Sequence, residues 1–229
     1  MPSRKLVETY RDYLAAGLAP PSAVQLHQKA ELVASDKERL AGDILKLEKF
    51  LNIETSPFIC LGMAHPQLSG TGPIARRVFV ALLGLPSMKA EDWHKGKRHT
   101  FIDPLVVPVE SEGTNSDIEY CFSALGIASR VDRWNVIDVQ LPGRQPLRLT
   151  GLDARVVQHE NDHIHGIICV DRSYRQGHSI SYVPPEVKKL FSEYQKQGRV
   201  WPWPCRITQW QAMKLGDFSL EPYIPLLDW

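Results

Sequence analysis

The stretch Gln158-His159-Glu160-Asn161-Asp162-His163 constrains this chain most, because it places two imidazoles four residues apart. Residues i and i+4 lie one above the other on a helix face, so a helix would let both histidines bind one ion. Glu160 lies one position further round and could take a proton from a water on that ion. The stretch therefore predicts a metal site on a helix. The alternative is a chance match in which the two histidines only cap or pack.

The residues that flank this motif favour a helix. Leu152, Val156 and Val157 follow Gly151 at spacings typical of the buried face of a helix. Gly166 is a residue type that commonly ends a helix. We therefore expect one helix from about residue 151 to residue 166.

The rest of the chain divides into a helical beginning and a strand-rich middle. Charged residues alternate with apolar ones between residues 24 and 51, which predicts one or two amphipathic helices. Runs of β-branched residues punctuated by glycine and proline predict short strands. These runs cover residues 77–83, 100–102 and 105–109, and a hairpin of 136–141 and 147–150. Polar loops are predicted at 94–99 and 110–117, and a further helix at 185–197.

The composition is that of a globular protein without a strongly charged surface. Of 229 residues, 43% are hydrophobic, which is enough for a real core. The formal net charge of +1 provides no global field to attract nucleic acid or an anionic membrane. No apolar run approaches the roughly 18 residues that span a bilayer, and the four cysteines are widely scattered. We expect an intracellular protein that binds neither nucleic acid nor membrane directly.

Two segments upstream of the helix carry further chemistry. Cys121 is the obvious third ligand, because two histidines and one thiolate leave the fourth tetrahedral position open for water. The alternative for Cys121 is a small buried apolar residue. Between residues 60 and 67, the backbone at Gly62 could approach a ligand closely, and the Gln67 amide could donate to a developing oxyanion.

In this order, the three segments resemble the motifs of peptide deformylases: Gly-x-Gly-x-Ala-Ala-x-Gln, Glu-Gly-Cys-Leu-Ser and Gln-His-Glu-x-Asp-His. The third motif is matched in full. The second keeps Glu119, Cys121 and Ser123, and the first keeps Gly62, Ala64 and Gln67. The resemblance covers roughly residues 25–175. It implies an α+β fold in which mostly antiparallel β-sheets surround a central metal-binding helix, with a helix at the N-terminal side and a C-terminal extension.

The resemblance also implies a role for each matched residue. Cys121, His159 and His163 would bind one divalent ion, ferrous iron or zinc, and Glu160 would be the general acid and base. Gln67 and the backbone N–H of Phe122 would form the oxyanion hole. Arg133 would pair with Glu119 and so support the cysteine turn. The residues expected to contact substrate are Leu61, Gly62, Tyr120, Leu152 and Val156.

The reaction that this resemblance implies is hydrolysis of the formyl group from N-terminal formyl-methionine, with release of formate. The expected partners are formyl-methionine peptides of nascent chains, with the ribosome as a further candidate. Residues 1–24 would form an N-terminal extension, and the Trp- and Pro-rich residues 176–229 would pack on the core or form a homodimer. The expected compartment is the cytoplasm of a bacterium, or the matrix of a mitochondrion or another organelle in a eukaryote.

Four positions depart from the family motifs. Tyr120 and Cys60 replace glycines, Phe122 replaces a leucine and His65 replaces an alanine. Each larger side chain is expected near the substrate cleft. His65 is either a satisfied polar residue that faces a loop or a new contact to substrate.

These departures leave two alternatives to deformylation. One is a divergent deformylase-like protein with altered substrate or lost activity, which acts as a peptide- or partner-binding module. The other is an endopeptidase with a His-Glu-x-x-His helix, which is disfavoured because such an enzyme needs neither Cys121 nor the first motif.

Overall fold

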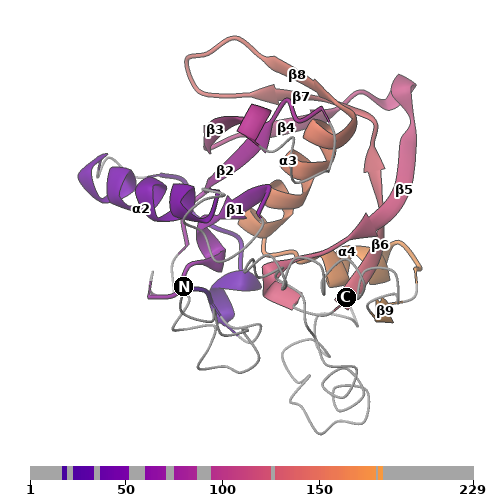
Figure 1. The fold of residues 1–229 in the computed structure, drawn as a ribbon, viewed down its shortest axis with the longest axis horizontal. Helices are drawn as coiled ribbons and strands as arrows, with labels where there is room; N and C mark the ends of the chain where they lie inside the picture. The colour runs from indigo at the N-terminus through magenta and orange to yellow at the C-terminus, as the bar shows by residue number, and fades with distance from the viewer. Residues whose placement is uncertain are drawn as a thin grey trace, which may run out of the picture.

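The structure is a computed structural model that describes residues 17–19, 23–33, 37–51, 60–70, 75–86, 94–124, 127–178 and 180–182. The helix predicted at 185–197 lies outside these residues. Figure 1 shows the helix α3 (Gly151–Ile164) in the middle of the molecule, with strands on both sides of it. The predicted α+β class is confirmed.

Three antiparallel sheets, each of three strands, are present in the described part of the chain. The first contains, in spatial order, β1 (Gly62–Ala64), β2 (Val78–Leu83) and β3 (Lys97–Ile102). The second contains β4 (Leu105–Pro108), β7 (Val136–Gln140) and β8 (Leu147–Thr150). The third contains β5 (Thr114–Glu119), β6 (Ile127–Trp134) and β9 (Ile180–Tyr182). The remaining elements are η1 (Val24–Leu26), α2 (Lys37–Phe50), η2 (His65–Gln67), η4 (Glu110–Glu112), η5 (Phe122–Ala124) and α4 (Cys169–Arg175).

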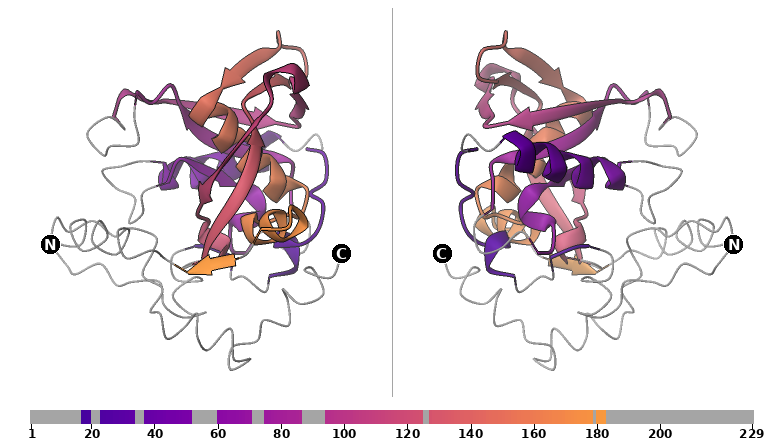
Figure 2. Two further views of the ribbon diagram at one scale, coloured as in Figure 1. Left: turned by 90° about the vertical axis from the view of Figure 1, so that its right-hand side faces the viewer. Right: turned by 90° about the vertical axis from the view of Figure 1, so that its left-hand side faces the viewer.

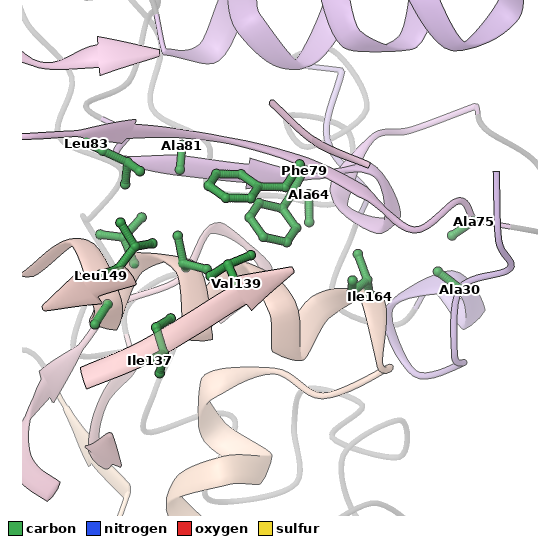
Figure 3. Close-up of a cluster of buried hydrophobic side chains, with 14 residues drawn as sticks. Ala30, Ala64, Ala75, Phe79, Ala81, Leu83, Ile137, Val139, Leu149 and Ile164 are labelled. Carbon is green, nitrogen blue, oxygen red and sulfur yellow. The ribbon is translucent and has the colours of Figure 1, made fainter. Parts of the chain in front are cut away.

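Strand β2 is buried along its whole length because it is covered on both faces. Its sequence, Val-Phe-Val-Ala-Leu-Leu, is the continuous apolar run expected of such a strand. Phe79, Ala81 and Leu83 point toward α3 and the second sheet, where Val139 and Leu149 meet them (Figure 3). The alternate residues of β2 pack instead with Leu47 and Phe50 of α2, which lies beside this sheet (Figure 2).

Helix α3 begins directly after β8 and ends at Ile164, close to the predicted bounds. Gly166 adopts a φ of +73°, the left-handed conformation that commonly follows a helix. A Cβ atom at this position would lie 2.8 Å from the backbone of Gln28, so the close approach of the two chains also requires glycine. The helix end is thus fixed against the segment that carries η1.

The strand predictions are confirmed for residues 77–83, 100–102 and 105–109 and for the hairpin, which forms β7 and β8. Both loop predictions are wrong in part. Strand β5 begins at Thr114 and β3 at Lys97, although their side chains there are polar and exposed. Backbone pairing with β6 and β2 decides the conformation in these strands, and side-chain polarity does not.

The helical prediction for residues 24–51 is confirmed for α2, which is preceded by the short helix η1. Leu32 and Leu45 do not join the core, because 64% and 62% of their surfaces are exposed. None of the described helices is both long enough and apolar enough to cross a membrane.

Candidate metal centre and active site

The three predicted ligands lie together although they come from distant segments. His159 and His163 project from α3, and Cys121 follows β5 in the turn before η5. One ligand atom of each residue lies within 4.8 Å of the other two, and Cys121 Sγ is 3.1 Å from His163 Nε2. Around a tetrahedral ion with bonds of about 2.0–2.3 Å, ligand atoms lie roughly 3.5 Å apart. The three side chains therefore fit one divalent ion.

Hydrogen bonding orients His159 for such a role. Its Nδ1 lies 2.9 Å from Glu119 Oε2, so the carboxylate holds a proton on Nδ1 and leaves Nε2 for an ion. Burial alone would lower the pKa of His159, but the hydrogen bond and the charge of Glu119 raise it to about 9, so an ion must displace the proton from Nε2 when it binds. His163 is fully buried, and burial lowers its pKa, which keeps its imidazole neutral as a ligand must be.

Glu160 lies buried beside these residues, and one of its oxygens has no partner in the described part of the chain. Only 3% of its surface is exposed, and its Oε2 makes no hydrogen bond within the described residues. Burial raises the pKa of Glu160 to about 7, near the range in which one carboxyl group can both accept and return a proton. An unpartnered buried carboxylate oxygen next to a ligand set fits a group that holds a reactive water.

Gly62 allows Glu160 to take this position. A Cβ atom built on Gly62 would lie 2.5 Å from Glu160 Oε1 and 2.6 Å from its Cγ, closer than real Cβ contacts. Strand β1 therefore passes directly against the carboxylate, and any side chain at this position would have to displace it. β1 also forms one edge of its sheet, because its ladder in that sheet is with β2. An edge strand can pair with an extended peptide.

The amide of Gln67 is held in one orientation. Its Oε1 accepts a hydrogen bond of 2.8 Å from the backbone N–H of Ala64. Its Nε2 consequently points toward the ligand set, 3.3 Å from Ser123 Oγ and 3.7 Å from Cys121 Sγ. Gln67 thus presents a donor next to the candidate metal centre, on the side of η2.

A buried network of ion pairs holds the Glu119 carboxylate that contacts His159. Arg133, on β6, donates two hydrogen bonds to the Glu119 carboxylate, at 2.9 and 2.8 Å. Its third nitrogen donates to Asp162 at 2.5 Å. Burial opposes ionisation of Glu119, but the charge and hydrogen bonds of Arg133 hold its pKa far below the usual range. Arg133 therefore pairs with Glu119 as expected, and its contact with Asp162 links this pair to α3.

Three members of this network were missed in the sequence. Arg155 donates to Glu119 Oε1 at 2.8 Å, and Arg172 binds both oxygens of Asp162. The signal for Arg155 was its position four residues before His159, which places both on one face of α3. The signal for Asp162 was a carboxylate on the buried side of the helix. A buried charge requires a partner of opposite charge.

Two of the four departures from the family motifs are buried side chains. His65 is 1% exposed and lies between helix α2 and the segment before β2. Its Nε2 donates to Asp43 at 3.1 Å, and its Nδ1 accepts from the backbone N–H of Arg76 at 3.2 Å. His65 is thus a satisfied buried residue. The side chain of Phe122 packs in the apolar cluster between α2 and β2.

The other two departures remain close to the site. Cys60 is buried, and its thiol donates to the carbonyl oxygen of Gly62 at 2.7 Å. Tyr120 is half-buried between β5 and Cys121. Of the residues expected to contact substrate, Val156 belongs to the buried apolar cluster below β2, and Leu61 and Leu152 pack against that cluster.

Comparisons with known proteins agree with this geometry. The family model for polypeptide deformylase matches residues 18–178. A peptide deformylase from Thermomicrobium roseum is 34% identical over 130 residues, which cover 55% of this chain and 69% of the relative. The peptide deformylase of Dictyoglomus thermophilum is 30% identical over 65% of this chain and 84% of its own length.

Solved structures with the same fold are deformylases as well. A probable peptide deformylase from the Synechococcus phage S-SSM7 superposes with a TM-score of 0.50 at 30% identity, over 65% of this chain and 93% of the phage protein. The enzyme of Synechococcus elongatus, solved in complex with actinonin, gives a TM-score of 0.54 at 24% identity, over 80% of this chain and 88% of that enzyme. With the family model matching most of its length, the chain belongs to the peptide deformylase family of hydrolases.

Proposed function

We propose that this chain removes the formyl group from the N-terminal formyl-methionine of nascent polypeptides in a metal-dependent hydrolysis that releases formate. The observation that carries the proposal is the set of ligand atoms of Cys121, His159 and His163, with the unpartnered oxygen of Glu160 beside it. A binding module would need neither the converged ligand atoms nor a buried carboxylate without a partner.

Each residue near the ligand set has a proposed task. A divalent ion bound there would supply a Lewis acid and a water whose pKa falls from 15.7 toward about 7. Glu160 would take the proton of that water and return it to the departing amine. Gln67 Nε2 and the backbone N–H of Phe122 would donate hydrogen bonds to the formyl oxygen as it gains charge.

The substrate peptide would pair with β1 at Gly62 and place its methionine side chain against Leu61, Leu152 and Val156. Two observations support this pose: β1 is an edge strand, and the three apolar side chains lie in one cluster beside it. Tyr120 would border the groove and narrow it.

We propose ferrous iron as the resident metal, with zinc as the other ion that suits one thiolate and two imidazoles. The ribosome is a proposed partner, and dimerisation through residues 176–229 a proposed role of the extension.

Formate release from a formyl-Met-Ala-Ser peptide tests the function and its metal dependence together. Protein purified anaerobically and loaded with iron should release formate, and a chelator should abolish the release because the three ligands then hold no Lewis acid. Iron added back should restore it. An acetyl-Met-Ala-Ser peptide is the matched substrate control, and its hydrolysis should be much slower if the proposed activity is specific for the formyl group.

Two results would contradict the proposed function. If protein with full metal occupancy releases no formate above the chelated sample, the alternative of a binding module with lost activity stands. Cleavage of casein that a chelator abolishes would instead favour an endopeptidase.

Replacement of Gly62 by alanine should lower kcat/KM on the order of 10²-fold, the cost of displacing a catalytic group by about 1 Å. The new methyl group must displace the Glu160 carboxylate, which lies 2.5 Å from the position of the added Cβ. The matched control is Gly42→Ala on α2, because no atom lies within 4 Å of its added Cβ. Steady-state kinetics that show equal activity in the two variants would place Glu160 elsewhere during catalysis.

A further inference from the structure

The turn that carries Gln67 also carries a buried histidine. His65 is the first residue of η2 and Gln67 is the last, with Pro66 between them. The fixed φ of proline stiffens this turn, and so does the hydrogen bond of 3.1 Å from the Leu68 N–H to the carbonyl oxygen of His65. A displacement of His65 would therefore move Gln67 with it.

Both ring nitrogens of His65 bind to other elements. Its Nδ1 accepts a hydrogen bond of 3.2 Å from the backbone N–H of Arg76, in the segment before β2. Because Nδ1 is the acceptor, the proton lies on Nε2, which donates to Asp43 Oδ2 on α2 at 3.1 Å. Burial lowers the pKa of His65, so the imidazole stays neutral and keeps this tautomer. His65 thus links η2 to α2 and to the start of β2.

The amide of Gln67 lies at the other end of this chain of contacts. The backbone N–H of Ala19 donates to the carbonyl oxygen of Gln67 at 2.7 Å, so η2 is fixed on a second side as well. The side-chain Nε2 lies 3.3 Å from Ser123 Oγ, next to the candidate metal centre. A donor stabilises an oxyanion over a narrow range of distance, roughly 2.7–3.1 Å, so a small shift of η2 would take Nε2 out of range.

We propose that Asp43 and His65 form a positioning pair, which fixes η2 so that Gln67 Nε2 meets the formyl oxygen as it gains charge. A buried pair of hydrogen-bonded groups fixes one relative position of two elements, whereas an apolar contact tolerates sliding. Both residues lie outside the ligand set, so they act through Gln67. This inference rests on the proposed function, and it gives a role to a histidine that stands where the family motif has alanine.

The cost of losing His65 should depend on the presence of Gln67. Gln67→Ala should lower kcat on the order of 10²–10³-fold, the usual cost of losing an oxyanion donor. His65→Ala should lower kcat on the order of tenfold, a part of that cost, with little change in KM. In protein that already carries Gln67→Ala, the further substitution His65→Ala should cost less than about twofold, because no amide remains to be positioned.

Variants of Asp43 separate positioning from a general loss of packing. Asp43→Asn keeps an acceptor for His65 Nε2 and should retain most of the activity, whereas Asp43→Leu should behave as His65→Ala does. Lys46→Ala is the matched control, because Lys46 binds the other oxygen of Asp43, at 3.1 Å, from an exposed side chain. Thermal unfolding followed by circular dichroism shows that each variant is folded in the assay. If His65→Ala is not, Asp43→Leu with and without Gln67 gives the same comparison.

A second readout needs neither activity nor metal. In heteronuclear NMR spectra of isotope-labelled, chelated protein, the side-chain amide signals of Gln67 are the pair that Gln67→Ala removes. These signals should shift in His65→Ala and in Asp43→Leu, and they should stay in place in Lys46→Ala. The inference is overturned if they do not move, if His65→Ala leaves kcat unchanged, or if His65→Ala costs as much without Gln67 as with it.

The two readouts keep this inference apart from the proposed function. Protein whose Gln67 signals respond to His65→Ala, but that releases no formate, would contradict the proposed function and leave the positioning of the amide standing. Protein that releases formate, but in which His65→Ala changes neither kcat nor the Gln67 signals, would contradict the positioning alone.

Discussion

The Glu160→Gln variant is expected to lose about 10²–10⁴-fold in kcat/KM for formyl-methionine peptides, the contribution typical of one general acid–base group. Glutamine has the shape of glutamate, so the packing against Gly62 and the helix around it should persist. The amide cannot accept the proton of an attacking water, nor return it to the departing amine. The loss should therefore appear in kcat, with the metal still bound.

Metal content must be measured on the same samples to make this result decisive. Glu160 adjoins the ligand His159, so a fall in activity without bound metal would report lost binding and not lost proton transfer. Glu110→Gln, on the exposed helix η4, is the matched control and should leave both quantities unchanged. If Glu160→Gln with full metal retains more than about a tenth of the activity, another group is the base.

The ligand helix could be predicted from the sequence because its evidence is local. Two histidines at i and i+4, apolar residues at helical spacing and Gly166 all act within one element, and α3 has nearly the predicted bounds. The hairpin of β7 and β8 was equally visible, since both strands and their turn are adjacent in the chain.

What the sequence did not reveal depends on contacts between distant segments. The exposed strand at Thr114 exists because β6 pairs with it, and its own residues are polar. His65 was expected to be either a satisfied polar residue or a contact to substrate, and the sequence could not decide because its partner Asp43 lies on α2, which no local pattern connects to the first motif. Spacing within one segment predicts none of these.

Arg133→Met should lower the free energy of unfolding by about 3–5 kcal/mol, the usual cost of removing one partner from a buried ion pair. Arg133 is 3% exposed and donates to both Glu119 and Asp162, so its loss leaves two buried carboxylates with fewer donors. Arg155 and Arg172 still contact these carboxylates, which limits the cost. Arg133→Lys keeps the charge but not the two-bond geometry. Its free energy of unfolding should lie between those of the unchanged protein and Arg133→Met.

Urea unfolding of the metal-free proteins measures this effect, with Arg148→Met as the matched control. Arg148 makes the same two-bond contact with Asp138, at 2.8 and 2.8 Å, but its side chain is 62% exposed. Its replacement should shift the unfolding midpoint far less, because water screens that pair.

Arg133 also steadies the carboxylate that orients His159, so the Arg133→Met substitution should weaken metal binding by about 10–100-fold. Equal midpoints in the two methionine variants would show that the buried network does not hold the fold, and unchanged metal affinity would show that Glu119 orients His159 without Arg133.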